Sequence, residues 1–222
     1  MRLFIQNDFC SEQPHQRENR PARRRAMTVE MQPIPHMRPI TVEEFDALPV
    51  DNSVIYEIEN GFLLVNARPA PPHSRVLRRL ANQIDNQLPN GWEAFEELDA
   101  ELPVGKSPRR SPDLVVAPEA VDQQVRVRSD QIVLAVEISS SGESAVREYS
   151  LKAGEYAANG IPHYWVIDLL DLEGSAVGLT VFVLGDNGRY EIQPRVTGTV
   201  DVDEPFPLTI DLDALIVRKS DR

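Results

Sequence analysis

The order of the apolar runs between residues 73 and 168 constrains the fold of this chain most strongly. Apolar residues recur at 3.6-residue spacing from His73 to Leu88, which predicts a helix with one buried face. Three strand-like runs, a second helical pattern and a further strand-like run follow. This order predicts an α/β fold in which helices pack on a mixed β-sheet.

Local signals predict further elements on both sides of this core. Thr41 and Glu44 have the spacing of a capping box, so we expect a short helix through Leu48. Asn60-Gly61 joins two apolar runs, which predicts an N-terminal β-hairpin of residues 54–58 and 62–65. The other expected elements are strands at 92–104, 113–117, 132–138, 163–168, 180–184, 190–193 and 208–210, a polar connector at 118–130, and a helix at 143–158.

Composition divides the chain and excludes several classes of protein. Residues 7–25 are polar, have no apolar period and end in the basic cluster Arg23-Arg24-Arg25, so we expect a disordered basic tail at 1–36 followed by one domain at 37–222. The net charge of −12 argues against a protein that coats nucleic acid by bulk charge. The single cysteine excludes an intramolecular disulfide framework. The sequence has no membrane-spanning run and no secretory signal pattern, so we expect a cytoplasmic protein.

Three acidic residues stand where apolar residues would be expected. Glu57 lies inside an apolar strand, Asp113 opens a strand, and Glu137 interrupts the most hydrophobic run of the chain. A buried carboxylate must be paired, protonated or metal-bound. Three of them on neighbouring strands could converge on one cation, and oxygen ligands favour Mg²⁺ or Mn²⁺.

Lys152 adds a positive charge to this constellation. Helical geometry places it beside Tyr156, at the margin of the buried face of its helix, from where it can reach Glu137. Carboxylate-bound Mg²⁺ with a nearby ammonium group is suited to phosphodiester hydrolysis, in which charge develops on the phosphate.

An ordered set of motifs resembles the bacterial Uma-two family of restriction endonucleases, which belongs to the PD-(D/E)xK nuclease superfamily. The resemblance spans about residues 41 to 215. It is carried by Tyr56-Glu57-Ile58, Asn60-Gly61, His73, Ser111-Pro112-Asp113, Val136-Glu137-Ile138-Ser139, Lys152 with Tyr156, Gly160-Ile161-Pro162 and the run 164–168.

The resemblance implies a restriction-endonuclease-like fold and a Mg²⁺-dependent (or Mn²⁺-dependent) endonuclease that acts on DNA. Asp113 and Glu137 would be metal ligands, and Glu57 would be the upstream acid that completes the site. The lysine expected two residues after Glu137 is replaced by Ser139, so Lys152 would be a lysine that has migrated to the following helix. The chain departs from the family pattern at Glu148 and at Asn60, where the family usually has aspartate.

Each candidate also has a purely structural interpretation. His73 could assist proton transfer at the rim of the site, or it could cap or pack its helix. Glu148 and Lys152 could form a surface ion pair, and Arg75, Arg78 and Arg79 are interpreted as a solvated face rather than a phosphate-binding stripe. Tyr156, Tyr164 and Trp165 are interpreted as core residues, and Asp168 as structural.

Two other functions remain open besides the nuclease. A catalytically silent nuclease-fold binding module would explain the acidic charge of the body. A glycosidase would use paired carboxylates and give Lys152 no role. Cleavage of both strands of a duplex would be easier for a homodimer.

Overall fold

The computed structural model describes residues 38–140, 143–169 and 176–217, with only the backbone described at 140 and 143–148. These residues belong to one unit of the chain, residues 37–222. The predicted tail at 1–36 lies outside the described residues.

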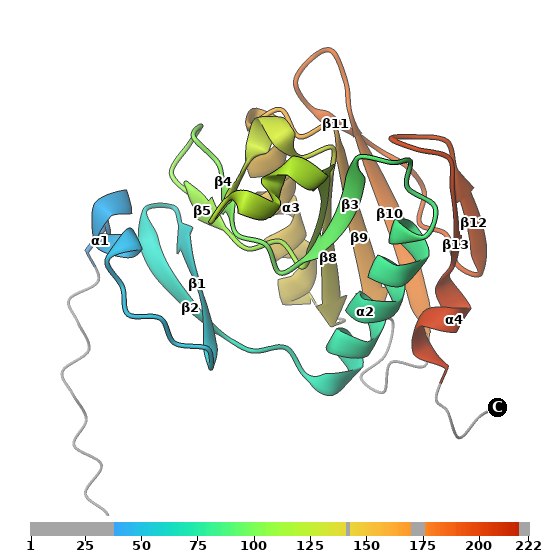
Figure 1. Cartoon of the computed structure of the whole chain (residues 1–222), viewed down its shortest axis with the longest axis horizontal. Coiled ribbons are helices and arrows are strands. Elements are labelled where there is room, and N and C mark those ends of the chain that lie inside the picture. The colour runs from blue at the N-terminus through green and yellow to red at the C-terminus, as the bar shows by residue number, and fades with distance from the viewer. Residues whose placement is uncertain (1–37, 141–142, 170–175, 218–222) are drawn as a thin grey trace, which may run out of the picture. The chain divides into compact units, whose positions relative to one another are not determined.

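A six-stranded mixed sheet forms the centre of the described chain (Figure 1). In spatial order the strands are β11 (Tyr190–Ile192), β10 (Val177–Leu184), β9 (His163–Leu169), β8 (Leu134–Ser140), β6 (Leu114–Pro118) and β3 (Trp92–Glu96). Strands β8 and β9 are parallel, and every other pair in this sheet is antiparallel. Helix α3 (Glu143–Ala158) connects the parallel pair. The predicted α/β class is confirmed.

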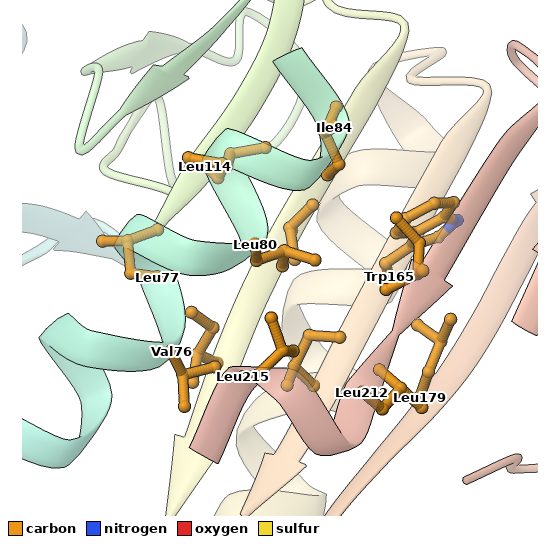
Figure 2. Packing of buried hydrophobic residues seen from close by; sticks show 14 of the residues in the cluster. Val76, Leu77, Leu80, Ile84, Leu114, Trp165, Leu179, Leu212 and Leu215 are labelled. Carbon is orange, nitrogen blue, oxygen red and sulfur yellow. The ribbon is translucent and has the colours of Figure 1, made fainter. Parts of the chain in front are cut away.

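Helices cover both faces of this sheet. On one face, helices α2 (Pro71–Asp85) and α4 (Leu212–Ile216) pack their leucines over Leu114, Trp165 and Leu179 (Figure 2). On the other face, Tyr156 of α3 packs with Val115, Ala135 and Tyr164. Successive strand residues alternate between the two cores, as the period of a strand requires. The strands are therefore buried on both faces, which accounts for their nearly continuous apolar sequences.

Smaller sheets and short helices complete the chain. Asn60 and Gly61, with φ of 50° and 86°, form the predicted turn of the hairpin, and the capping box of Thr41 and Glu44 is present. The remaining elements are α1 (Val42–Asp46), β1 (Val54–Glu59) with β2 (Phe62–Ala67), β4 (Ala100–Glu101) with β5 (Arg109–Arg110) and β7 (Val127–Arg128), β12 (Thr199–Val202) with β13 (Leu208–Asp211), and the 3₁₀ turns η1 (Glu119–Gln123) and η2 (Ser129–Gln131).

The structure differs from the sequence-based expectations in three places. The strand expected at 92–104 is broken at Glu97, whose φ of 50° turns the backbone, so β3 and β4 belong to different sheets. The polar connector at 118–130 contains β7 and η1. Strand β12 and helix α4 were not predicted, because they are short and their positions depend on tertiary partners.

Within the described ranges, no helix combines the length and the apolar character needed to cross a membrane.

Candidate active site

The pairing of β6 with β8 places two of the predicted acids side by side. Leu114 is opposite Val136, so Asp113, directly before β6, lies beside Glu137 in the middle of β8. The backbone N–H of Ile138 donates to Asp113 Oδ2 at 2.6 Å. Since Glu137 has the same parity as Ala135, its side chain is on the face of the sheet covered by α3.

Glu137 is held by two side chains from α3. Lys152 Nζ donates to Glu137 Oε2 at 2.8 Å, and Tyr156 OH donates to Glu137 Oε1 at 2.7 Å. All three residues are buried. Burial raises the pKa of Glu137 to about 7; Lys152 partly offsets this effect, and the charges of Asp113 and Glu57 add to it. Burial and the neighbouring Glu137 also raise the pKa of Tyr156 well above its usual value, so its hydroxyl stays a donor.

His73 approaches the same acids from the first turn of α2. Its Nε2 lies 3.1 Å from Asp113 Oδ2, and the two side chains are 15% and 13% exposed. Burial alone would lower the pKa of His73, but the hydrogen bond and charge of Asp113 outweigh it, so the pKa is raised. His73 therefore lies at a partly exposed edge of this group of residues.

Glu57 comes to the site from the hairpin. Its side chain is buried, with Oε1 accepting from the N–H of Ser111 at 3.1 Å and Oε2 accepting from Asn66 Nδ2 at 2.9 Å. The guanidinium of Arg110 lies 3.7 Å from Oε2. The structure thus brings the five predicted site residues together. Asp113 and Glu137 are neighbours on β6 and β8. His73 of α2 contacts Asp113, Lys152 of α3 contacts Glu137, and the charge of Glu57 in β1 acts on Glu137.

The donor set matches a hard divalent cation in its chemistry. Asp113 and Glu137 supply carboxylate oxygens from adjacent strands, and mutual repulsion among the acids helps to raise the pKa of Glu137, which a cation would relieve. In the part of the chain that the structure describes, however, no three His, Cys, Asp or Glu side chains are gathered closely enough to hold an ion. Asp113 and Glu137, which lie side by side, fit as a pair of ligands; oxygens of all three acids, including Glu57, accept hydrogen bonds from protein groups that a bound ion would have to share or displace.

Sequence reasoning missed or misread three residues of this region. Tyr156 is a core residue as predicted, but its hydroxyl also binds Glu137; the four-residue spacing from Lys152 is the signal for this role. Arg110 is fully buried beside Glu57, and an Arg-Arg pair before Ser111 gave no sign of it. Arg79 binds the carbonyl oxygens of Ala214 and Leu215 rather than facing solvent. The side chain of Glu148 lies outside the described residues.

A mixed sheet with helices on both faces, with Asp113 at the start of β6, Glu137 in β8 and Lys152 on the helix that follows β8, defines a restriction-endonuclease-like protein. The family model Uma2, described as "Putative restriction endonuclease", matches residues 42–214. The chain belongs to this family, which is the one that its motifs resemble.

A solved structure shares the fold. The crystal structure of "a putative nuclease belonging to DUF820 from Anabaena variabilis ATCC 29413" has a TM-score of 0.60 with this chain at 19% identity, covering 81% of this chain and 100% of that one. At this identity the likeness concerns the fold alone. No curated protein matches the chain.

Proposed function

We propose that this protein is a divalent-metal-dependent endonuclease that hydrolyses phosphodiester bonds of DNA. The observation that carries the proposal is the buried ion pair of Lys152 with Glu137, which the β6–β8 register sets beside Asp113. A lysine that served only solubility would not be placed at 5% exposure against a carboxylate.

Asp113 and Glu137 would hold the ion, Mg²⁺ or Mn²⁺, with Glu57 as the third acid of the site. The bound ion would supply Lewis-acid stabilisation of the phosphate and a more acidic water. The ammonium of Lys152 would hold the attacking water by hydrogen bonding and offset the negative charge that develops on the phosphate. Tyr156 would keep the Glu137 carboxylate oriented.

His73 would act at the exposed side of the site. Its raised pKa favours the imidazolium form, which can donate to a phosphate oxygen or to the departing oxygen. In hydrolysis, the oxygen of water bonds to phosphorus, the bond from phosphorus to the leaving oxygen breaks, and that oxygen takes up a proton.

Incubation of the full chain with supercoiled plasmid and with single-stranded DNA, in Mg²⁺, Mn²⁺ or EDTA, tests the proposal. We expect metal-dependent cleavage that falls at least a hundredfold in Asp113→Ala and in Lys152→Met. Asp201→Asn is the control, because Asp201 is exposed and its side chain accepts from Thr209 within the C-terminal strand pair β12–β13, away from the candidate site residues in sequence. Cleavage in EDTA, or an Asp113→Ala variant as active as the unmodified protein, would refute the proposal.

The second candidate function is a catalytically silent binding module with the nuclease fold. It is favoured by the hydrogen bonds that protein groups already make to Asp113, Glu137 and Glu57. A chain that binds DNA but no divalent cation in a calorimetric titration would support this function over the first.

A further inference from the structure

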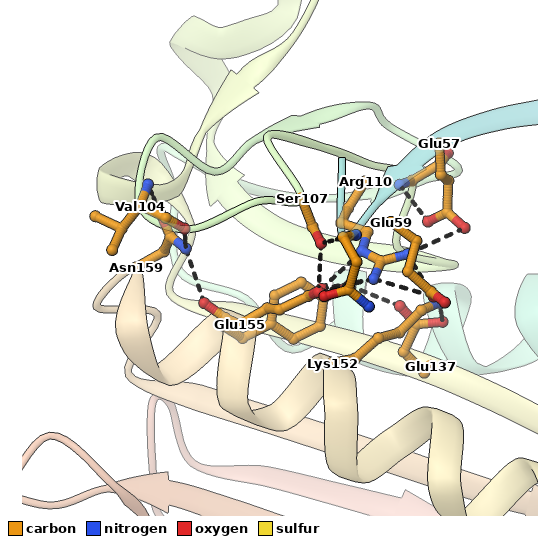
Figure 3. Close-up of polar contacts among 12 residues, drawn as sticks. Glu57, Glu59, Val104, Ser107, Arg110, Glu137, Lys152, Glu155 and Asn159 are labelled. Atoms are coloured by element: carbon orange, nitrogen blue, oxygen red, sulfur yellow. Dashed lines mark hydrogen bonds and ion pairs between the residues drawn. The ribbon is translucent and has the colours of Figure 1, made fainter. Parts of the chain in front are cut away.

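Arg110 is a buried guanidinium that contacts both the hairpin and helix α3. Its side chain is 0% exposed. On one side, Nε and Nη2 donate to the two carboxylate oxygens of Glu155 in α3, at 2.7 and 2.9 Å. On the other side, its Nη atoms lie 3.3 Å from Glu59 and 3.7 Å from Glu57, both in β1 (Figure 3). One side chain therefore joins the element that carries Glu57 to the element that carries Lys152.

The chain segment that leads to Arg110 strengthens this connection. Ser107 Oγ donates to Glu155 Oε1 at 2.5 Å and accepts from the backbone N–H of Asn60 at 3.0 Å, at the tip of the hairpin. Directly after the last residue of α3, Asn159 makes two hydrogen bonds to the backbone of Val104, at 2.8 and 2.9 Å (Figure 3). The segment 104–110 thus contacts α3 at two points and the hairpin at two points.

The charges explain why an arginine is required at this position. Glu57, Glu59 and Glu155 surround Arg110, and the charges of Glu57 and Glu155 outweigh the effect of burial, so that the pKa of Arg110 is raised. The guanidinium is planar and donates along two edges at once, whereas a lysine is a point charge that cannot span two carboxylates with fixed geometry. Its neighbour Arg109 is similarly buried, but it pairs with Asp46 and Glu101.

We infer that Arg110 is a positioning residue for the metal centre: it fixes the carboxylate of Glu57 relative to the Glu137–Lys152 pair by holding Glu57 and Glu155 with one side chain. Glu155 follows Lys152 by three residues, so the bidentate contact to Glu155 sets the depth and rotation of α3 where Lys152 projects. Arg110 is not one of the proposed metal ligands; its contacts are with Glu57, Glu59 and Glu155, and it acts through the groups that it aligns. The inference rests on the proposed function.

Mn²⁺ binding to the full chain, followed by the paramagnetic resonance signal of free Mn²⁺, tests this role without relying on cleavage. We expect Arg110→Lys to raise the dissociation constant for Mn²⁺ about tenfold or more, as is usual when a residue that supports metal ligands is lost. The matched control Arg109→Lys, one residue away on the same strand, should stay within twofold. The Mn²⁺ concentration that gives half-maximal DNA cleavage should shift with the dissociation constant, while the rate at saturating Mn²⁺ changes less.

Glu155→Gln is the second variant, because it keeps Arg110 and its contacts with the hairpin and weakens the contacts that Arg110 and Ser107 make to α3. It should raise the dissociation constant several-fold, and it decides the question if Arg110→Lys does not fold. A folded Arg110→Lys or Glu155→Gln variant that binds Mn²⁺ as tightly as the unmodified protein would overturn the positioning role of Arg110 and leave the proposed function intact. An unmodified protein that binds no Mn²⁺ would overturn the proposed function, and the inference with it.

Discussion

The buried carboxylate of Glu137 lies between the ammonium group of Lys152 and the hydroxyl group of Tyr156. Lys152 and Tyr156 each occupy one of its oxygens, so the charge is stabilised by two donors from the same helix. Removal of one member of such a pair leaves an uncompensated buried group, which costs more than the pair itself contributes.

Lys152→Met is therefore expected to lower the free energy of unfolding by about 3–5 kcal/mol at pH 8. The loss should be smaller at pH 5, since Glu137, with a pKa of about 7, is then protonated. The double variant Lys152→Met/Glu137→Gln should recover much of the stability, because no charge remains unpaired. Urea unfolding of the three proteins measures this, and a single variant as stable as the unmodified protein at pH 8 would contradict it.

The raised pKa of Glu137 also predicts how stability depends on pH. The folded state binds this proton more tightly than the unfolded state, where the pKa is 4.5. The stabilisation that the Glu137 proton contributes to the folded state is therefore complete below pH 4.5, and it is lost as the pH rises to about 7.

Between pH 5 and pH 8, the stability of the unmodified protein relative to Glu137→Gln should fall by about 2–3 kcal/mol. Urea unfolding of both proteins in EDTA at each pH measures the difference. A difference that does not change with pH would show that Glu137 is ionised throughout this range.

Among the elements, those with a strong local signal could be predicted from the sequence. The capping box of Thr41, the Asn60-Gly61 turn and the bounds of α3 each follow from a few neighbouring residues, and all three are present. Strands β4, β5 and β7 have only two residues each, too few for an alternating pattern, so they exist only through their partners.

The candidate site likewise contains residues that a local sequence signal identified and one that depends on distant parts of the chain. Glu57, Asp113 and Glu137 were conspicuous because acids interrupted apolar strands. The burial of Arg110 could not be predicted, because Arg109-Arg110 between Pro108 and Ser111 reads as an exposed loop. Its environment is created by Glu59 and Glu155, which are 51 and 45 residues away in the chain.

The turn of the β1–β2 hairpin provides a prediction at the scale of a single element. Gly61 has φ of 86°, and an added Cβ would meet only Pro39 Cβ at 3.9 Å, so Gly61→Ala introduces backbone strain without a clash. We expect a cost of about 1–2 kcal/mol in the free energy of unfolding. Because the hairpin carries Glu57, Mn²⁺ affinity should also fall.

Gly91→Ala is the control for this variant, since Gly91 has φ of 89° with nothing within 4 Å of the added Cβ, and it precedes β3 rather than the hairpin. It should cost similar stability and leave Mn²⁺ binding unchanged. Equal effects of both variants on Mn²⁺ binding would argue against a role for the hairpin in the site.

At the scale of the whole domain, Arg79 links helix α2 to helix α4, which is far from it in the sequence. It donates from α2 to the carbonyl oxygens of Ala214 and Leu215 at 3.1 and 2.9 Å, across 135 and 136 residues of sequence. Leu212 and Leu215 of α4 lie in the same core as Leu80 of α2. The cation also complements the negative end of a helix.

Arg79→Gln should lower the free energy of unfolding by about 1.5–3 kcal/mol, the range for a hydrogen bond from a charged group. Arg78→Gln, at an exposed position of the same helix, should change it by less than about 0.5 kcal/mol. Thermal unfolding compares the two. If Arg79→Gln instead impaired DNA cleavage and left stability unchanged, a phosphate-binding stripe on α2 would be indicated.

The crossover from β8 through α3 to β9 has a consequence for the order in which the site assembles. The entropy lost on loop closure grows with the number of residues enclosed. The contact of Glu137 with Lys152 encloses 15 residues, that of Asp113 with Ile138 encloses 25, and that of Glu57 with Ser111 encloses 54. Loop-closure entropy therefore favours formation of the acid–lysine pair first and of the Asp113 contact next, and it penalises most the contact by which the hairpin brings Glu57 to the other acids.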